Sequence, residues 1–131
     1  MLQTLSWALF DLANTFFAVA MLSFYFPLWV VEDQGAKELT VSLALGGSMA
    51  CVAVLMPFCG ALSDVTGQHM RWLRWTTYGC TAATALIGMT SSLGVALVLF
   101  AIANGCYQLG TVFYDALLWR LAPRGRLGQV S

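Results

Sequence analysis

The sequence predicts an all-α membrane protein with four transmembrane helices. Of its 131 residues, 60% are hydrophobic and only 9% are charged, and the mean hydropathy is +0.78. A soluble domain carries about 25% charged residues, so this chain cannot cover a globule with solvated side chains. The composition therefore argues against a soluble enzyme and against a nucleic-acid binder. A membrane-spanning helix takes about 20 residues, and the intervals between charges supply such lengths.

The first two helices follow from the two uncharged intervals nearest the N-terminus. Twenty uncharged residues separate Asp11 from Glu32, and the apolar residues just upstream extend this helix to 6–31. Twenty-five uncharged residues fill 39–63, which we expect to be the second helix. Because lipid offers backbone groups no hydrogen-bond partners, we expect helices in these intervals and not open strands.

The third and fourth helices come from a single longer interval. Forty uncharged residues separate Arg74 from Asp115, and one helix of that length would measure about 60 Å, twice the hydrocarbon thickness of about 30 Å. The interval must therefore fold back once. The polar cluster at 90–92 is the expected turn, which predicts helices over 70–90 and 93–121.

The distribution of basic residues predicts the orientation. Five of the six basic residues lie near the loop between the second and third helices or at the end of the fourth: Arg71, Arg74, Arg120, Arg124 and Arg126. Only Lys37 lies on the other side, between the first and second helices. Because Lys and Arg are enriched in cytoplasmic loops, we expect a multi-pass integral membrane protein with both termini cytoplasmic.

The cysteine and histidine content predicts no metal site. The four cysteines lie inside apolar stretches, where free cysteine behaves as a small hydrophobe. The single histidine, His69, stands alone in the sequence. We therefore expect no metal, no cofactor and no catalytic residue.

The segment that joins the second and third helices reads Gly60-Ala-Leu-Ser-Asp64-Val-Thr-Gly67, and Arg71 follows it. Gly60 would allow close helix packing, Asp64 would cap or pair at the membrane edge, and Gly67 would make the short turn. The segment resembles the G-x-L-x-D-x-x-G loop of the major facilitator superfamily, which lies between the same two helices on the cytoplasmic side. The resemblance implies that these four residues belong to a gating loop. Positions 65 and 68–70 lack the basic residues that are usual there.

Further segments resemble the Unknown Major Facilitator family, which includes the vacuolar amino-acid effluxers. Residues 6–17 are similar to the W-x-x-x-D-x-A-N opening of that family's helix 1, and residues 103–118 are similar to its helix 4, which ends F-Y-N-A. Residues 124–131 resemble its loop leading to helix 5. Asp115 stands where the family usually has Asn, and the fourth helix lacks the buried arginine of many proton-driven drug exporters.

The resemblance spans nearly the whole chain but only the first third of a twelve-helix transporter. It implies that the four helices form part of the N-terminal six-helix half of a major facilitator fold, and that the chain is a fragment. It also implies secondary-active transport of a small metabolite, such as an amino acid, by rocker-type alternating access. The expected partners are the small-molecule substrate, the lipid bilayer and the remaining transporter helices, without nucleic acid.

Two polar residues of the first helix are candidates for the substrate path. Asp11 lies about one turn inside 6–31, and Asn14 follows on the same face. Acidic residues inside a membrane helix are costly and tend to face a bundle interior or a water-filled path. The alternative is that Asp11 caps the start of the helix at the level of the lipid head groups.

A longer polar stripe marks the fourth helix. Asn104, Gln108, Thr111 and Asp115 follow one another at spacings of four, three and four and share one face. The superfamily resemblance implies that this face lines the central cavity, so Asn104, Gln108 and Asp115 are further candidates for the substrate path. The two amides need partners that lipid cannot supply, and a closed hydrogen-bond contact with a neighbouring helix would also supply them. Asp115 has a second alternative, which is to snorkel beside Arg120.

Two other functions remain open at this point. One is a complete four-helix exporter that works as a dimer, like the small multidrug resistance proteins. Those proteins have a Glu deep in helix 1 and a weak charge bias, whereas this chain has Asp11 near the helix end and a five-to-one bias. The other is a non-transporting four-span scaffold protein. Whether the coding frame continues past Ser131 with more apolar spans distinguishes the three.

Overall fold

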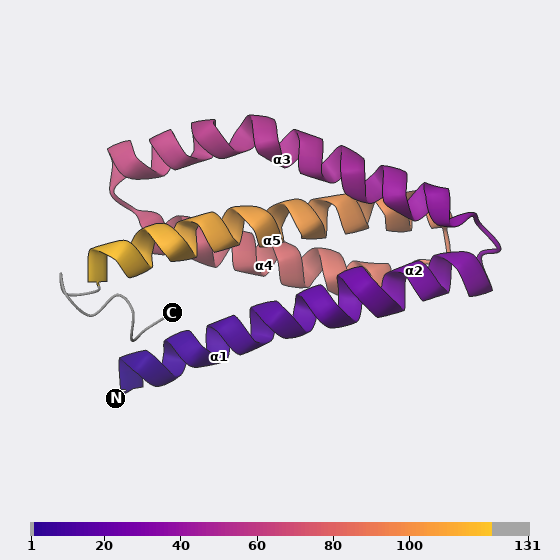
Figure 1. The fold of residues 1–131 in the computed structure, drawn as a ribbon, viewed down its shortest axis with the longest axis horizontal. Coiled ribbons are helices and arrows are strands. Elements are labelled where there is room, and N and C mark those ends of the chain that lie inside the picture. Colours follow the sequence, from indigo (N-terminus) through magenta and orange to yellow (C-terminus); the bar gives the residue numbers. More distant parts are fainter. Residues whose placement is uncertain (1, 122–131) are drawn as a thin grey trace.

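The computed structural model describes residues 2–121, with side chains over 5–117, and every regular element in that range is a helix (Figure 1). The N-terminal rod, residues 2–33, is one continuous helical segment made of α1 (Leu2–Phe17), η1 (Ala18–Tyr25), α2 (Phe26–Leu28) and η2 (Trp29–Asp33). It is followed by α3 (Glu38–Thr66), α4 (His69–Ile87) and α5 (Leu93–Leu121). The expected ranges were 6–31, 39–63, 70–90 and 93–121. Each of the four observed helical segments overlaps one of these ranges.

The wide π-helical turns of the N-terminal rod lie on both sides of Pro27. The N–H of Phe26 bonds the carbonyl of Met21, and Ser23 Oγ donates to the carbonyl of Ala18 at 3.3 Å, each five residues back. Proline has no N–H and its ring clashes with the carbonyl four residues back. A wider turn next to proline absorbs that clash, and the rod continues through Pro27 as helix.

A left-handed glycine ends α3. Gly67 has φ +63°, and its N–H donates to the carbonyl of Ser63 at 2.9 Å. This is the common glycine ending of a helix, which satisfies a carbonyl of the last turn. The chain reverses within two residues, and α4 begins at His69.

Successive helices run antiparallel (Figure 1). The start of the N-terminal rod and the turn between α3 and α4 lie at one end of the bundle, hereafter the α3–α4 end. The loops 34–37 and 88–92 lie at the other, hereafter the α4–α5 end. α5 packs most extensively against α4 and next against α3. It is therefore the central helix, with α3, α4 and the N-terminal rod around it.

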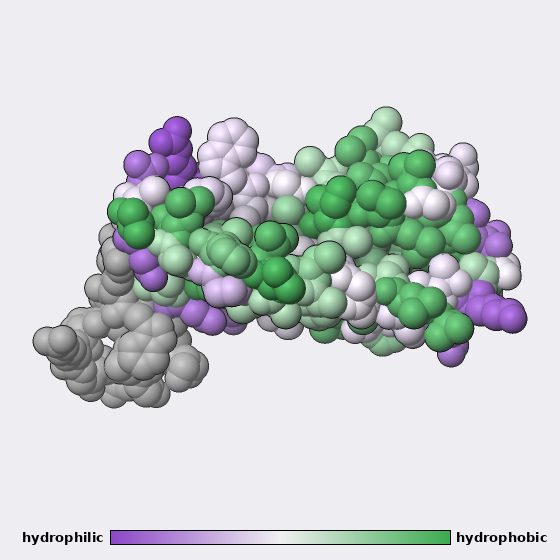
Figure 2. All heavy atoms as spheres, turned by 90° about the horizontal axis from the view of Figure 1, so that it is seen from above, coloured by the Kyte–Doolittle hydropathy of each residue, from purple (hydrophilic) through white to green (hydrophobic). Residues whose placement is uncertain are grey.

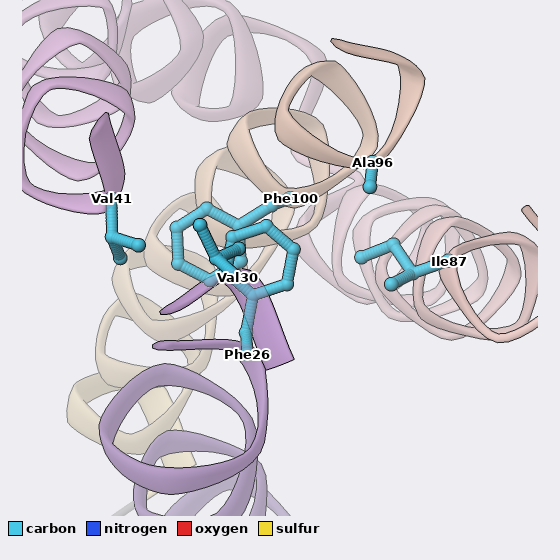
Figure 3. Close-up of a cluster of buried hydrophobic side chains, with 6 residues drawn as sticks. All are labelled: Phe26, Val30, Val41, Ile87, Ala96 and Phe100. Carbon is cyan, nitrogen blue, oxygen red and sulfur yellow. The ribbon is translucent and has the colours of Figure 1, made fainter. Parts of the chain in front are cut away.

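The apolar core gathers toward the α4–α5 end, where all four helical segments meet (Figure 3). The rings of Phe26 and Phe100 stack with centroids 4.0 Å apart and planes 3° apart. Aromatic pairs in such contact add about 0.5–1.5 kcal/mol to the burial of their surface. Four further buried side chains complete the cluster: Val30, Val41, Ile87 and Ala96. Each helical segment contributes at least one of these six residues.

On the face that Figure 2 shows, apolar residues dominate the middle of the bundle, and the most hydrophilic residues lie toward its two ends. The N-terminal rod exposes large hydrophobic side chains along its length, among them Leu5, Leu12 and Phe16, each more than 60% exposed. In water such a band would be an aggregation site, whereas in a bilayer it faces acyl chains. The surface fits an integral membrane protein.

The expectation of four spans is not confirmed by helix length and hydropathy. Within the described residues, three helices are long and apolar enough to cross a membrane: Leu5–Asp33, Glu38–Thr66 and Leu93–Leu117. α4 is not among them, because Arg71 and Arg74 lie in its first turns and threonines recur along it, which lowers its hydropathy. The fourth helix exists, but its membrane crossing does not follow from its composition.

Candidate functional site

On one side, α5 contacts the N-terminal rod through a polar pair. Asn14 Nδ2 donates to Thr111 Oγ1 at 3.2 Å, and Thr111 Oγ1 donates to the carbonyl of Tyr107 at 3.1 Å. One turn nearer the α4–α5 end, the ring of Tyr107 contacts that of Phe17, with centroids 5.4 Å apart. The pair is only part-buried, so its polar atoms lie near the surface of the described helices.

On the other side, α5 contacts α3 through a closed polar pair. Asn104 is 0% exposed, and its Nδ2 donates to Ser48 Oγ at 2.7 Å. Ser48 Oγ in turn donates to the carbonyl of Leu45 at 2.8 Å. Asn104 Oδ1 is buried and has no hydrogen-bond partner among the described residues. Of the two arrangements that the sequence left open for this amide, the structure places it in the closed contact.

Gln108 lies one turn further along α5 and is half-buried. Its Nε2 lies 3.4 Å from Met49 Sδ, a weak acceptor on α3. A thioether is a poor hydrogen-bond partner for an amide. The Gln108 amide is therefore still able to bind another polar group, whereas the Asn104 amide nitrogen already donates to Ser48.

The polar stripe of α5 therefore divides between two neighbouring segments. Asn104 and Gln108 contact α3, whereas Thr111 contacts the N-terminal rod through Asn14. The five path candidates do not converge on one enclosed cavity within the described residues. The stripe instead forms the face of α5 that lies between α3 and the N-terminal rod.

The two acidic candidates lie at the α3–α4 end. Asp11 and Asp115 are both exposed, and neither makes a salt bridge within the part of the chain that the structure describes. The suggested snorkelling of Asp115 beside Arg120 depends on the Arg120 side chain, which lies outside the described residues. Arg124 and Arg126 also lie outside them. Exposure of both carboxylates at one end is compatible with the head-group level and with the mouth of a path.

A groove of about 430 Å³ lies between the N-terminal rod, α4 and α5. Of the five path candidates, only Asn14 lines it, and no charged side chain does. Thr77 and Thr84 also line it, but their hydroxyls donate to the carbonyls of Leu73 and Cys80, four residues back, at 2.8 Å each. Such bonds turn the hydroxyl toward its own helix. The groove is therefore largely apolar, as a surface that packs against lipid or another helix would be.

In the predicted gating loop, Asp64 pairs with a residue that sequence reasoning left alone. Asp64 Oδ1 lies 2.9 Å from His69 Nε2, and the two side chains are 67% and 2% exposed. The pair bridges the end of α3 and the start of α4 across Gly67. His69 Nδ1 is buried without a hydrogen-bond partner among the described residues. A separation of five residues across a glycine turn was the available signal for this pairing.

The other loop candidates lie nearby without joining the pair. Arg71 is exposed, and its Nη1 donates to Gln68 Oε1 at 3.1 Å. The carbonyl of Gly60 accepts from Ser63 Oγ at 2.8 Å. A Cβ built at Gly60 would meet no atom within 4 Å, so the close packing expected there does not occur among the described helices.

Close packing at small residues occurs instead around α5. A Cβ at Gly79 of α4 would lie 3.0 Å from Cys106 Sγ, and one at Gly110 would lie 3.3 Å from Thr76 Oγ1. Small residues let membrane helices approach closely. These glycines explain why α4 follows α5 so closely.

Nearly all of the chain is similar to parts of two longer proteins. It is 27% identical over 138 residues to the uncharacterized MFS-type transporter YxiO of Bacillus subtilis, which covers 98% of this chain and 32% of that protein. It is 25% identical over 127 residues to an uncharacterized protein of Aquifex aeolicus, which covers 95% of this chain and 32% of that protein. No protein-family model matches the sequence, and no solved structure matches it significantly.

The chain thus spans about a third of the length of these curated relatives. The Bacillus relative has the class of function that the loop and helix motifs indicated. The name of this relative gives neither a subfamily nor a substrate. By its apolar helices and by this similarity, the chain is an integral membrane protein that resembles part of an MFS-type transporter.

Proposed function

We propose that the chain contributes the first four helices to a major facilitator transporter, which moves a small metabolite such as an amino acid by alternating access. The observation that carries the proposal is the similarity of 98% of the chain to a third of an MFS-type transporter. The remaining helices are the required partners, because the polar stripe of α5 does not form an enclosed site with the described helices alone.

In this proposal α4 is a fourth span. Its 19 residues give a length of about 28 Å at about 1.5 Å per residue, close to the hydrocarbon thickness of about 30 Å. It packs along α5, which is long and apolar enough to cross. Arg71 and Arg74 lie in its first turns, from which long basic side chains reach the head groups.

The α3–α4 end is the cytoplasmic end in this proposal. Arg71 and Arg74 lie at that end, whereas Lys37 lies at the other among three acidic residues. Basic residues near the ends of spans favour the cytoplasmic side. Since the chain begins at the α3–α4 end and α5 finishes there, both termini are cytoplasmic.

The proposed substrate path runs along the face of α5 between the N-terminal rod and α3. Gln108 and the Asn14–Thr111 pair supply uncharged donors and acceptors at the middle of this face. Asp11 and Asp115 stand at its cytoplasmic mouth. Asn104 supports the path by fixing α5 to α3, since its donor is committed to Ser48.

The gating loop joins α3 to α4 at the same end. We assign to Asp64, paired with His69, the role of holding the two helices in one relative position. Gly67 supplies the tight turn, and Gly60 has open space beside it for a helix that lies beyond this chain. Rocking of the two transporter halves would then form and break contacts at this end of the bundle.

Counterflow in liposomes tests the proposal. The complete transporter that contains this chain is reconstituted into vesicles loaded with one unlabelled amino acid or organic acid at a time, and uptake of the labelled compound is followed. An alternating-access carrier gives transient accumulation above equilibrium for its substrate. Counterflow by the 131-residue chain alone would favour the dimeric four-helix exporter. If neither the chain alone nor the complete protein gives counterflow for any compound, the scaffold is favoured.

A further inference from the structure

The first turns of α4 carry a face that the bundle does not use. Arg71, Arg74, Trp75 and Tyr78 are spaced by three, one and three residues, which places all four on one side of a helix. All four are exposed, Trp75 and Tyr78 each by 67%. The opposite side of the same turns packs on α5, where Leu73 is buried.

Two shallow grooves lie on this face. One, of about 250 Å³, is lined by Arg71, Arg74, Trp75 and Tyr78. The second, of about 380 Å³, shares Arg71 and Trp75 with the first and is completed by three neighbours: Thr66, Gln68 and Trp72. No carboxylate lines either groove. Both grooves thus join basic groups to aromatic rings without a neutralising acid.

The two arginines keep their positive charge uncompensated in this structure. Arg71 Nη1 donates to the neutral Gln68 Oε1 at 3.1 Å. Within the described residues, neither Arg71 nor Arg74 makes a salt bridge. A guanidinium is a planar fork of donors that matches the oxygens of a phosphate. Two such forks one turn apart suit a single phosphodiester.

The position of the face points to a lipid as the source of that phosphate. Hydrophilic side chains gather at the ends of the apolar band of the bundle (Figure 2), and this face lies at the α3–α4 end. Trp and Tyr are enriched at the level of lipid head groups, where the ring is apolar on one side and wet on the other. Basic pockets at the cytoplasmic end of membrane helices bind anionic head groups.

We propose that this face of α4 binds an anionic phospholipid. Arg71 and Arg74 hold the phosphodiester, and the rings of Trp75 and Tyr78 lie against the glycerol and the first acyl carbons. The charge complementarity of two unpaired arginines selects the anionic lipid over a zwitterionic one. The proposal rests on the proposed position of the α3–α4 end at the cytoplasmic head groups, and it does not require that the protein transports anything.

Native mass spectrometry of the purified protein tests it. The protein in detergent is mixed with equal amounts of phosphatidylglycerol and phosphatidylcholine that carry the same acyl chains, and the retained adducts are counted. We expect a preference for phosphatidylglycerol, which falls about five-fold for each arginine removed in Arg71→Gln and Arg74→Gln. The matched control is Lys37→Gln, which removes the basic residue at the opposite end and should leave the preference unchanged.

Three results would overturn the proposal. The first is an unchanged preference in the Arg71→Gln, Arg74→Gln double variant, and the second is an equal loss in Lys37→Gln, which would indicate unspecific attraction. The third is displacement of phosphatidylglycerol by excess inorganic phosphate, which would indicate a site for a soluble anion. If the double variant does not give the helical circular dichroism of the wild type, Arg71→Lys with Arg74→Lys replaces it. These changes keep the charge and remove the fork, and they should lower the preference only in part.

Discussion

The contact between Asn104 and Ser48 should hold α5 to α3, and its energy can be isolated with a double-mutant cycle. The variants are Asn104→Ala, Ser48→Ala and the double variant. The bond is short, 2.7 Å, and Asn104 is fully buried. Hydrogen bonds between membrane helices average about 0.6 kcal/mol and reach about 1.7 kcal/mol, so we expect a coupling energy between these two values.

Other terms affect the single variants and cancel in the cycle. Asn104→Ala leaves a cavity, which destabilises, but it also removes Oδ1, which is buried without a partner among the described residues, and that stabilises. Both effects are present again in the double variant. The difference between the two legs therefore reports the Asn104–Ser48 contact, as long as neither single change creates a new contact.

The assay is unfolding of the purified protein by sodium dodecyl sulfate in mixed micelles, followed by circular dichroism. The control cycle pairs Asn14→Ala with Ser48→Ala. Asn14 bonds Thr111 on the other side of α5, so these two changes should add within about 0.3–0.5 kcal/mol. If the coupling between Asn104 and Ser48 is no larger than that of the control, the contact does not hold the two helices together.

Three further predictions concern the turn, the topology and the gating loop. Gly67→Ala should destabilise the protein by about 1–2 kcal/mol, because Gly67 has φ +63° and a side chain disfavours that conformation. Gly46→Ala is its control and should stabilise by about 0.5–1 kcal/mol, since Gly46 lies inside α3 with open space around it; equal effects in thermal unfolding would contradict the reasoning. In a background without the native cysteines, a membrane-impermeant thiol reagent added to intact cells should label Ala36→Cys and not Gln68→Cys, and labelling of the latter would overturn the topology. In the complete transporter, Asp64→Asn should slow transport without lowering the amount in the membrane, because it weakens the pair with the first residue of α4; wild-type turnover would reduce the loop to a connector.

The helices and their order were predictable because charges are costly inside a bilayer. The interval between Asp11 and Glu32 became the N-terminal rod, and the forty-residue interval after Arg74 folded back near its middle. The π-helical turns beside Pro27 were not predictable, since proline alone equally allows a kink or a helix end. The helix expected over 70–90 was found as α4, but its first turns contain Arg71 and Arg74, and helix length and hydropathy do not identify it as a span.

The sequence predicts which face of α5 carries the candidate site, but it does not predict which helices lie against that face. Helical spacing places Asn104, Gln108 and Thr111 on one side of α5. It does not say which helix lies opposite, and the structure divides the three between α3 and the N-terminal rod. The pairing of Asp64 with His69 was missed because the two belong to different helices, and their approach depends on the turn at Gly67.

Thiol accessibility along α5 tests the central claim, that the face between the N-terminal rod and α3 lies on a substrate path. The Gln108→Cys and Asn104→Cys variants of the complete transporter are compared in membranes, in a background without native cysteines. Gln108 is half-buried against a weak acceptor, whereas Asn104 is 0% exposed. We predict that small water-soluble thiol reagents modify Gln108→Cys from at least one side of the membrane and leave Asn104→Cys intact. If Gln108→Cys stays unreactive with reagent on either side, the face is a packing surface and the account is wrong.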